Sequence, residues 1–280
     1  MFKFLTSAAL VVVVVAVNLA NCSRLSPLFS RNAGGGVGGG GRIVGGRPAK
    51  LGEAPWQISL VSKGWFGWSH ICGGSLVGKR SVVTAAHCVD GAQPTTLQVK
   101  YGGLDRTQLA VTQLVTEIVM HPDWDTSAID YDYAVLTLDG DIQTNADSVQ
   151  TIQLIDRAPV SGDDRAQLTG WGNTVGGTSS SPVDLQYAEF RVVDRETCQQ
   201  QWDSTYPEYG QKITERIVCA GAPASSGCHG DSGGPFVIDQ KLAGIVSFGS
   251  PKCLQDTTKI ASGYANVYDQ LDWLNSKIVN

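Results

Sequence analysis

The chain has 280 residues, of which 42% are hydrophobic and 17% charged, and its formal net charge is −5 at pH 7. This is the composition of a globular protein and excludes a disordered or collagen-like chain. We expect no nucleic-acid partner, because binding to a phosphate backbone requires a basic surface that this acidic chain lacks.

The first 22 residues have the pattern of an export signal. Lys3 is followed by an apolar run from Leu5 to Val17, which is shorter than a bilayer-spanning helix of about 20 residues. One positive charge and a short apolar run are typical of a secretory signal peptide rather than of a membrane anchor. We therefore expect residues 1–22 to be removed and the mature protein to be extracellular, without membrane attachment.

Residues 23–42 form a second segment before the globular part of the chain. It is rich in glycine between Gly34 and Gly41 and ends at Arg42. Such a stretch cannot bury apolar surface and is typical of a flexible tether. It is either a plain linker or a propeptide, because an arginine at the end of a tether is easily reached by a protease.

From residue 43 to residue 280, short apolar runs broken by Gly, Pro, Asn and Asp predict an all-β domain. Two similar series of strands suggest two barrels, over about residues 43–150 and 155–265. The absence of alternating strands and helices argues against a parallel sheet. The expected strands are 57–61, 81–85, 96–101, 113–120, 134–138, 167–170, 187–193, 217–220, 235–238, 242–247 and 264–267.

The end of the chain predicts a single helix. Val267, Leu271, Leu274 and Ile278 recur at helical spacing, so that they share one apolar face. We expect this helix over about residues 267–278.

The seven cysteines fit an exported protein. They are Cys22, Cys72, Cys88, Cys198, Cys219, Cys228 and Cys253. Loss of Cys22 with the signal leaves an even number, as expected for disulfides in an oxidising compartment, but spacing alone does not choose among the possible pairings. No CxxC pair occurs, and the Cys and His residues lack the spacing of a zinc finger, so we expect no structural zinc.

Three segments of the domain carry candidate catalytic residues. Ser232 lies in Gly230–Pro235, where glycines let backbone N–H groups turn toward a developing oxyanion. A serine hydroxyl needs a base to become a nucleophile, and His87 and Asp132 supply a base and a carboxylate that orients it. Each alone could be structural: a glycine-rich turn, a core histidine or a strand cap.

With Arg42–Gly46, Thr169–Gly172 and Ser247–Gly249, these segments make residues 43–280 resemble the chymotrypsin/trypsin family of serine proteases, which has the same order of His, Asp and Ser. The resemblance implies two antiparallel six-stranded β-barrels packed together, with endopeptidase activity. Ser232 would be the nucleophile and His87 the general base.

The same resemblance implies the roles of the neighbouring groups. Asp132 would orient His87; it is preferred to Asp130 because the family's acid comes directly before an X-Ala-Val-Leu strand, which is Tyr133–Leu136 in this chain. The backbone N–H groups of Gly230 and Ser232 would form the oxyanion hole.

The resemblance also implies a zymogen. Cleavage between Arg42 and Ile43 would free an α-ammonium group that pairs with Asp231 inside the protein. His70 aligns with a histidine that lies near this acid in some zymogens of the family. The implied disulfides are Cys72–Cys88, Cys198–Cys219 and Cys228–Cys253.

No cofactor and no required metal are expected. The segment that corresponds to the calcium loop of trypsins has only Asp105 and Glu117 as acids between Gly102 and His121, too few for a hard-cation site.

The family resemblance assigns a substrate pocket with a neutral floor at Ser226 and walls at Gly249 and Gly263. Trypsins carry aspartate at the floor position, so a serine there argues against strict cleavage after Lys or Arg. A pocket with glycine walls implies chymotrypsin-like cleavage after Phe or Tyr, with Leu or Met as further candidates. The whole substrate-binding set is Ser226, Gly227, His229, Ser247, Phe248, Gly249 and Gly263.

Two alternatives to this function stay open: trypsin-like specificity, and an inactive homologue that acts as a binding protein. The implied partners are protein or peptide substrates, an activating protease and protein protease inhibitors. Nothing in the sequence requires more than a monomer.

Overall fold

The computed structural model describes residues 43, 45–174 and 181–280, which all belong to one structural unit. The expected signal peptide (residues 1–22) and the glycine-rich segment up to Arg42 lie outside the described residues.

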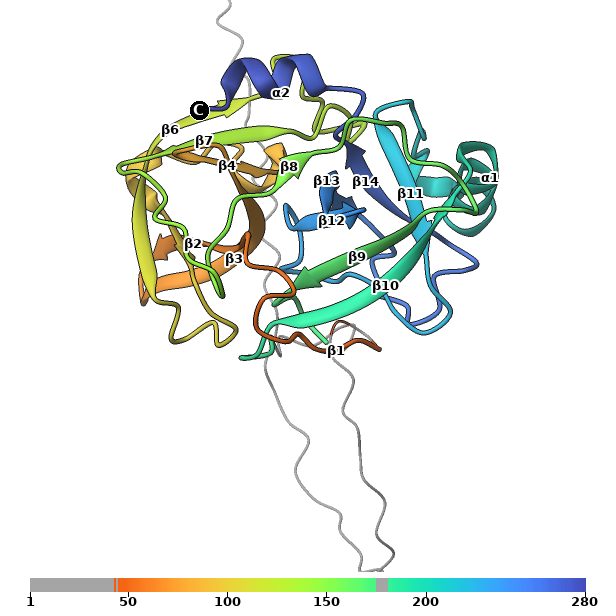
Figure 1. The fold of residues 1–280 in the computed structure, drawn as a ribbon. Coiled ribbons are helices and arrows are strands. Elements are labelled where there is room, and N and C mark those ends of the chain that lie inside the picture. The colour runs from red at the N-terminus through yellow and green to blue at the C-terminus, as the bar shows by residue number, and fades with distance from the viewer. Residues whose placement is uncertain (1–42, 44, 175–180) are drawn as a thin grey trace, which may run out of the picture. The chain divides into compact units, whose positions relative to one another are not determined.

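Six antiparallel strands close the first barrel in the order β2-β3-β4-β7-β6-β5 (Figure 1). Alternation of apolar and polar residues builds it: in β5, Leu97, Val99 and Tyr101 are buried, and the residues between them are only partly buried. The strands are β2 (Gln57–Gly64), β3 (Gly67–Val77), β4 (Ser81–Thr84), β5 (Leu97–Tyr101), β6 (Val111–Met120) and β7 (Ala134–Leu138).

The second barrel also has six antiparallel strands, and its ring closes because β9 pairs with both β10 and β12. Two short strands are added to it, and the second of them, β8, runs parallel to β13. The fold expectation of two six-stranded antiparallel barrels is therefore confirmed. The strands are β1 (Arg47–Pro48), β8 (Gln153–Leu154), β9 (Arg165–Gly170), β10 (Gln186–Val193), β11 (Ile217–Gly221), β12 (Pro235–Ile238), β13 (Lys241–Phe248) and β14 (Ser262–Asn266).

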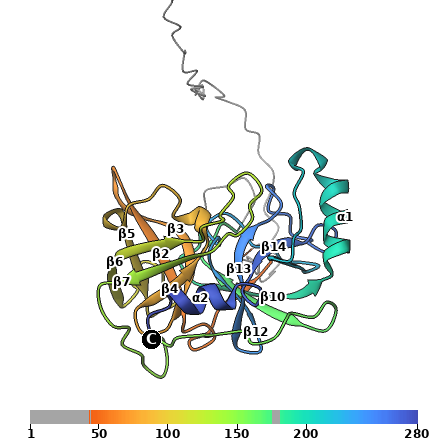
Figure 2. The same ribbon diagram turned by 90° about the horizontal axis from the view of Figure 1, so that it is seen from above.

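The first strand of the domain pairs with the second barrel, and the C-terminal end of the domain contacts the first barrel. β1 precedes the first barrel but pairs with β10 of the second. At the other end, α2 (Leu271–Lys277) lies close to β4 of the first barrel (Figure 2), and the Val279 N–H donates to the Ser81 hydroxyl at 2.9 Å. The predicted C-terminal helix is confirmed, although it begins four residues later than expected.

The two-residue strands β1 and β8 and two longer elements, β3 and α1, were not predicted. β3 contains Gly67, Gly73 and Gly74, which weaken a strand pattern, although Gly74 is needed because a Cβ there would lie 3.0 Å from Ile58. α1 (Arg195–Thr205) is mostly polar and buries only Cys198 and Trp202, so its apolar periodicity is too sparse to read. The short 3₁₀ helices are η1 (Ala86–Cys88), η2 (Pro94–Thr96) and η3 (Pro207–Tyr209).

The two barrels meet through a buried side-chain hydrogen bond and a close approach of two backbone segments. The Thr169 hydroxyl of β9 donates to the Gln57 side chain of β2 at 2.6 Å, and both atoms are buried. A Cβ at Gly73 would lie 2.9 Å from the Gly234 Cα, so only glycine fits at that point. The candidate catalytic residues lie along this junction.

Candidate active site

His87 and Asp132 are brought together by strand pairing. β4 ends just before His87 and β7 begins just after Asp132, and the two strands pair antiparallel with Thr84 opposite Ala134. The His87 Nδ1 atom lies 2.7 Å from Asp132 Oδ2, and the His87 backbone N–H donates to Oδ1 at 2.9 Å. The Asp132 carboxylate can only accept in this contact, so the proton lies on Nδ1 and Nε2 is left free to accept one.

A third donor, the Ser247 hydroxyl of β13, contacts Asp132 Oδ2 at 2.6 Å. Ser247 belongs to the second barrel, so Asp132 is held by both barrels. The sequence analysis placed Ser247 among substrate-binding residues; its side chain also supports the carboxylate.

Asp130 does not contact the imidazole. It pairs with Arg216 at 2.7 Å, and the Thr214 hydroxyl donates to it at 3.1 Å. Burial acts to raise the pKa of Asp130, but the Arg216 hydrogen bonds outweigh it and keep that pKa below its usual range. Asp130 is thus a link between the barrels, and Asp132 is the carboxylate at the histidine.

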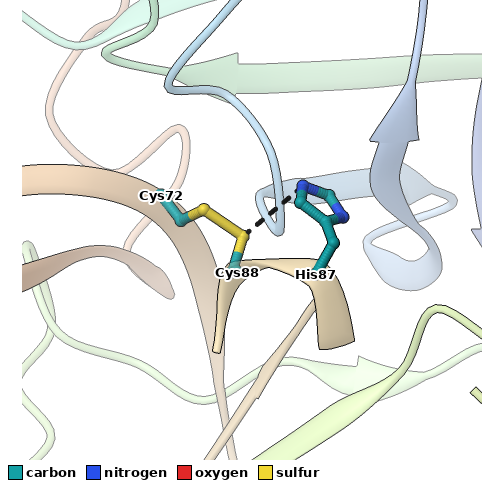
Figure 3. A group of neighbouring side chains, drawn as sticks. All are labelled: Cys72, His87 and Cys88. Carbon is teal, nitrogen blue, oxygen red and sulfur yellow. Dashed lines mark hydrogen bonds between the residues drawn. A yellow bond between two sulfur atoms is a disulfide. The ribbon is translucent and has the colours of Figure 1, made fainter. Parts of the chain in front are cut away.

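The loop that carries Ser232 is attached to β3. The Gly73 N–H donates to the Ser232 carbonyl at 2.7 Å, and the neighbouring residue Cys72 forms a disulfide with Cys88, next to His87 (Figure 3). Among the described residues, no hydrogen bond joins the Ser232 hydroxyl to the imidazole, whose Nε2 lies 3.8 Å from Cys88 Sγ. Such contacts are often loose in enzymes without substrate.

Two backbone amides of the Ser232 loop are left without partners among the described residues. The His229 carbonyl accepts from the Asn173 N–H at 2.8 Å, and the Asp231 carbonyl accepts from the Gly234 N–H at 2.9 Å. In a trans peptide the N–H points opposite to the carbonyl, so the N–H groups of Gly230 and Ser232 are directed away from these contacts. Two free N–H donors of this kind can bind an oxyanion.

Gly230 has to be glycine for this arrangement. Its φ angle is +97°, in the region that other residues rarely adopt. A Cβ there would lie 3.1 Å from the Gly172 Cα.

Asp231 is completely buried and has no cation as a partner among the described residues. Its carboxylate accepts from the Gly172 N–H at 2.8 Å and from the Cys228 N–H at 2.9 Å. Burial raises the pKa of Asp231 to about 6, because two amides only partly replace lost hydration. Ile43, the residue expected to become the new N-terminus, is also fully buried.

His70 lies beneath the oxyanion amides. Its Nε2 contacts the Gly230 carbonyl at 3.0 Å and its Nδ1 contacts the Ser59 hydroxyl at 2.8 Å. Burial lowers the pKa of His70 to about 4, so the ring is neutral at pH 7. In this structure His70 therefore holds the Gly230 carbonyl, and no contact with Asp231 is seen within the described part of the chain.

A cavity of about 270 Å³ opens beside Ser232. Five of the seven predicted substrate-binding residues line it: Gly227, His229, Ser247, Phe248 and Gly249. Ser226 is buried outside this lining, and its hydroxyl has no hydrogen-bond partner among the described residues. No Asp or Glu side chain lines the cavity in the described residues.

Gly263 does not form a pocket wall. A Cβ on Gly263 would lie 2.2 Å from the ring of Phe248, so this glycine makes room for that ring. The cavity is instead lined by Ser262, and a Cβ on Gly249 would lie 3.1 Å from the Ser262 hydroxyl oxygen. The pocket therefore has one glycine wall and one serine wall.

The rim of the pocket has support that the sequence analysis missed. Trp202 of α1 packs edge-on against Phe248, with ring centroids 5.2 Å apart, and donates from its indole N–H to the Ala261 carbonyl at 2.9 Å. The only sequence signal was the spacing of Cys198 and Trp202, four residues apart.

The disulfides are Cys72–Cys88, Cys198–Cys219 and Cys228–Cys253, the pairing that the family resemblance implies. The Sγ atoms of Cys72 and Cys88 and a ring nitrogen of His87 lie within 4.8 Å of one another (Figure 3). These three residues do not make a metal site, because a metal binds free thiolates and both sulfurs are used in the disulfide.

Comparison with known proteins identifies the class. A sequence model of the trypsin family matches residues 43–274. The chain is 34% identical to Trypsin Blo t 3 of Blomia tropicalis, over 85% of this chain and 86% of that protein. It is 35% identical to Trypsin alpha of Drosophila melanogaster, over 86% of this chain and 87% of that protein.

The fold gives the same result. The solved structure of neuropsin, a serine protease expressed in the limbic system of mouse brain, matches with a TM-score of 0.71 and 30% identity, covering 82% of this chain and 97% of that chain. The molecule is thus a serine endopeptidase with the two-barrel fold. The chain belongs to the chymotrypsin/trypsin family. None of the described helices has the length and apolar character needed to cross a membrane.

Proposed function

We propose that this protein is a secreted endopeptidase that cleaves after large apolar or aromatic residues and is made as a zymogen activated between Arg42 and Ile43. The observation that carries the specificity is the cavity beside Ser232, which has no carboxylate among the described residues to pair with Lys or Arg. Protein and peptide substrates, an activating protease and protein inhibitors are the partners of such an enzyme.

The geometry supports an acyl-enzyme mechanism. His87 Nε2 takes the proton from the Ser232 hydroxyl, whose oxygen attacks the substrate carbonyl, while Asp132 stabilises the imidazolium that forms. The N–H groups of Gly230 and Ser232 bind the oxygen that becomes negative. His87 then gives its proton to the leaving amine, and water releases the acyl group by the reverse steps.

The pocket supports a chymotrypsin-like preference over a trypsin-like one. A neutral serine, Ser226, stands where the family alignment puts the acid of trypsins, and no carboxylate of the described residues lines the cavity in its place. The Ser262 hydroxyl narrows one wall, so we expect Phe, Leu and Met to be accepted more readily than Trp. Relatives with the name trypsin keep the trypsin-like alternative open.

The surroundings of Asp231 support activation by an ammonium group. In the part of the chain that the structure describes, this fully buried carboxylate is bonded only to amides and has no countercharge, and Ile43 is buried in the same domain. A new α-ammonium on Ile43 would supply that charge and fix the Ser232 loop. Export is supported by the three disulfides and by the pattern of residues 1–22.

Digestion of a peptide library by the activated enzyme tests the specificity. We expect cuts after Phe, Tyr, Leu and Met. Abundant cuts after Lys or Arg would establish the trypsin-like alternative instead.

A fluorophosphonate probe tests the enzyme against the binding-protein alternative. We expect the activated chain and an exposed-serine control, Ser276→Ala, to be labelled, and Ser232→Ala to stay unlabelled. Equal labelling of Ser232→Ala, or no labelling of the activated chain, would contradict the proposed nucleophile.

A further inference from the structure

The hairpin that joins β2 and β3 is coloured orange in Figures 1 and 2. Its tip carries exposed aromatic side chains. Trp65 and Phe66 are 102% and 107% exposed, and Trp68 nearby is 36% exposed. Aromatic rings stabilise a fold by being buried, so the two rings at the tip contribute nothing to this domain by packing.

The hairpin holds these rings in a defined position. Its strands stay paired up to the last residues, with Lys63 opposite Trp68 and Gly64 opposite Gly67. Trp65 and Phe66 are therefore the two residues of the turn, and Gly67 has the φ angle of +110° that closes it. A surface that is already ordered loses little entropy when a partner binds.

β3 connects this tip directly to the active site. Its residue His70 contacts the Gly230 carbonyl at 3.0 Å, and Cys72 forms the disulfide with Cys88. His87 Nε2, the group that protonates the leaving amine, lies 3.8 Å from the Cys88 sulfur. We therefore expect the substrate segment after the cut to pass over this disulfide.

We propose that Trp65 and Phe66 bind the segment of a protein substrate that follows the cut, and that they favour an apolar or aromatic residue about four to six positions beyond it. The tip is six residues before Cys72 along β3, and an extended substrate covers about the same distance per residue, ~3.3 Å. This proposal deepens the proposed endopeptidase function and rests on it.

Charge favours a peptide over a lipid surface as the occupant. Lys63 is the only charged residue from Gln57 to Val77, and the net charge of the whole chain is −5. Binding to an anionic membrane requires a cluster of Lys or Arg beside the apolar residues. The single Lys63 suits an acidic residue next to the apolar one in the substrate.

Three substrates with the same residues before the cut test the proposal on the activated enzyme. The first ends in a fluorogenic leaving group. The second continues for about seven residues with Phe at positions four to six, and the third has Ser there. The tested enzyme is the double variant Trp65→Ser/Phe66→Ser, and the matched control is Leu51→Ser, a 60%-exposed leucine outside the hairpin.

We expect the double variant to lower kcat/KM about tenfold on the Phe-containing long substrate, mainly through KM, as for truncation of aromatic contacts in an interface. The short and the Ser-containing substrates should be cleaved at unchanged rates, and Leu51→Ser should change none of the three. Unchanged cleavage of the Phe-containing substrate would overturn the proposal. Equal losses on all three would also overturn it, because they indicate a role in the fold.

The remaining outcomes separate this proposal from its rivals. Failure of the wild-type enzyme to cleave even the short substrate would refute the proposed function itself. Sedimentation with phosphatidylserine vesicles that needs Trp65 and Phe66, with no effect on the long substrates, would overturn the proposal in favour of membrane binding.

Discussion

Two buried carboxylates beside the candidate active site, Asp132 and Asp231, have different surroundings. Asp132 accepts three hydrogen bonds, from the backbone and ring of His87 and from Ser247, at 2.6–2.9 Å. Within the described residues, Asp231 accepts only from two backbone amides, and burial raises its pKa to about 6.

The two carboxylates therefore suit different roles: Asp132 suits the catalytic reaction, and Asp231 suits the proposed activation by cleavage. The imidazole ring of His87, which contacts Asp132, becomes positively charged during the proposed reaction. The Asp132 carboxylate therefore gains a countercharge in each catalytic cycle. Asp231 has only the fixed dipoles of two amides as partners among the described residues, and in the proposed activation its countercharge comes from the new ammonium group of Ile43. The following substitutions test whether Asp132 and Asp231 have these different roles.

The largest effect is expected at Asp132. Asp132→Asn should lower kcat about 10⁴-fold, a magnitude established for this family, because the amide group favours the wrong tautomer of His87. Steady-state kinetics on the activated enzyme measures it. The control Asp123→Asn changes a 67%-exposed side chain before the same strand and should leave kcat unchanged; equal losses in the two variants would contradict the assignment.

Asp231→Asn should have the next largest effect. After cleavage at Arg42, the new ammonium group would lack its carboxylate, and loss of one partner of a buried pair costs about 3–5 kcal/mol. We expect kcat/KM to fall about 150- to 4,000-fold, which is the same free energy at about 1.4 kcal/mol per tenfold. N-terminal sequencing should show that cleavage itself is complete; full activity of the cleaved variant would rule out this switch.

The pH dependence of the free energy of unfolding tests the surroundings of Asp231 in the uncleaved chain. Arg42→Gln removes the proposed cleavage site and Ser232→Ala removes the proposed nucleophile, so the chain stays uncleaved. The raised pKa of Asp231 means that the folded state holds its proton more tightly than the unfolded state does. Its contribution is therefore complete below pH ~4 and is lost as the pH rises through about 6, a change of about 3 kcal/mol.

Urea unfolding at a series of pH values measures this contribution as a difference between two chains. The same background with Asp231→Asn should lack the loss between pH ~4 and the folded pKa of about 6. If the free energy of unfolding changes with pH in the same way in both chains, the pKa of Asp231 is not raised by folding.

The smallest effect is expected at Ser247, which supplies one of three donors to Asp132. Ser247→Ala should lower kcat about tenfold, because a hydrogen bond to a charged group is worth about 1.5–3 kcal/mol. Ser204→Ala, an exposed serine of α1, is the control and should have no effect. A loss as large as that of Asp132→Asn would mean that Ser247 itself takes part in the reaction.

Much of the fold could be predicted because its signals are local. Strands such as β5 and β7 show period-two burial or continuous apolar runs between turn residues, and the C-terminal helix has a clear apolar face. The sequence pattern did not predict β3 and α1, because the burial of their residues depends on contacts with residues far away in the chain. Gly74 fits against Ile58, and Trp202 packs against Phe248, contacts that no local pattern reveals.

The substrate pocket shows where reasoning from the sequence failed. Successive side chains of a strand point to opposite faces. In β14, Ser262 and Tyr264 line the cavity, and Gly263 between them does not. The wall therefore falls at Ser262, one residue before the predicted Gly263.

The sequence by itself determined the family, the cysteines available for disulfides and the residues that can carry the chemistry, because these depend on short motifs and on their order. Only the tertiary structure decided that Asp231 is buried with no countercharge among the described residues, that Ser262 lines the pocket and that Trp65 and Phe66 remain exposed. Burial and strand register result from contacts between segments far apart in the chain, and no local pattern contains them.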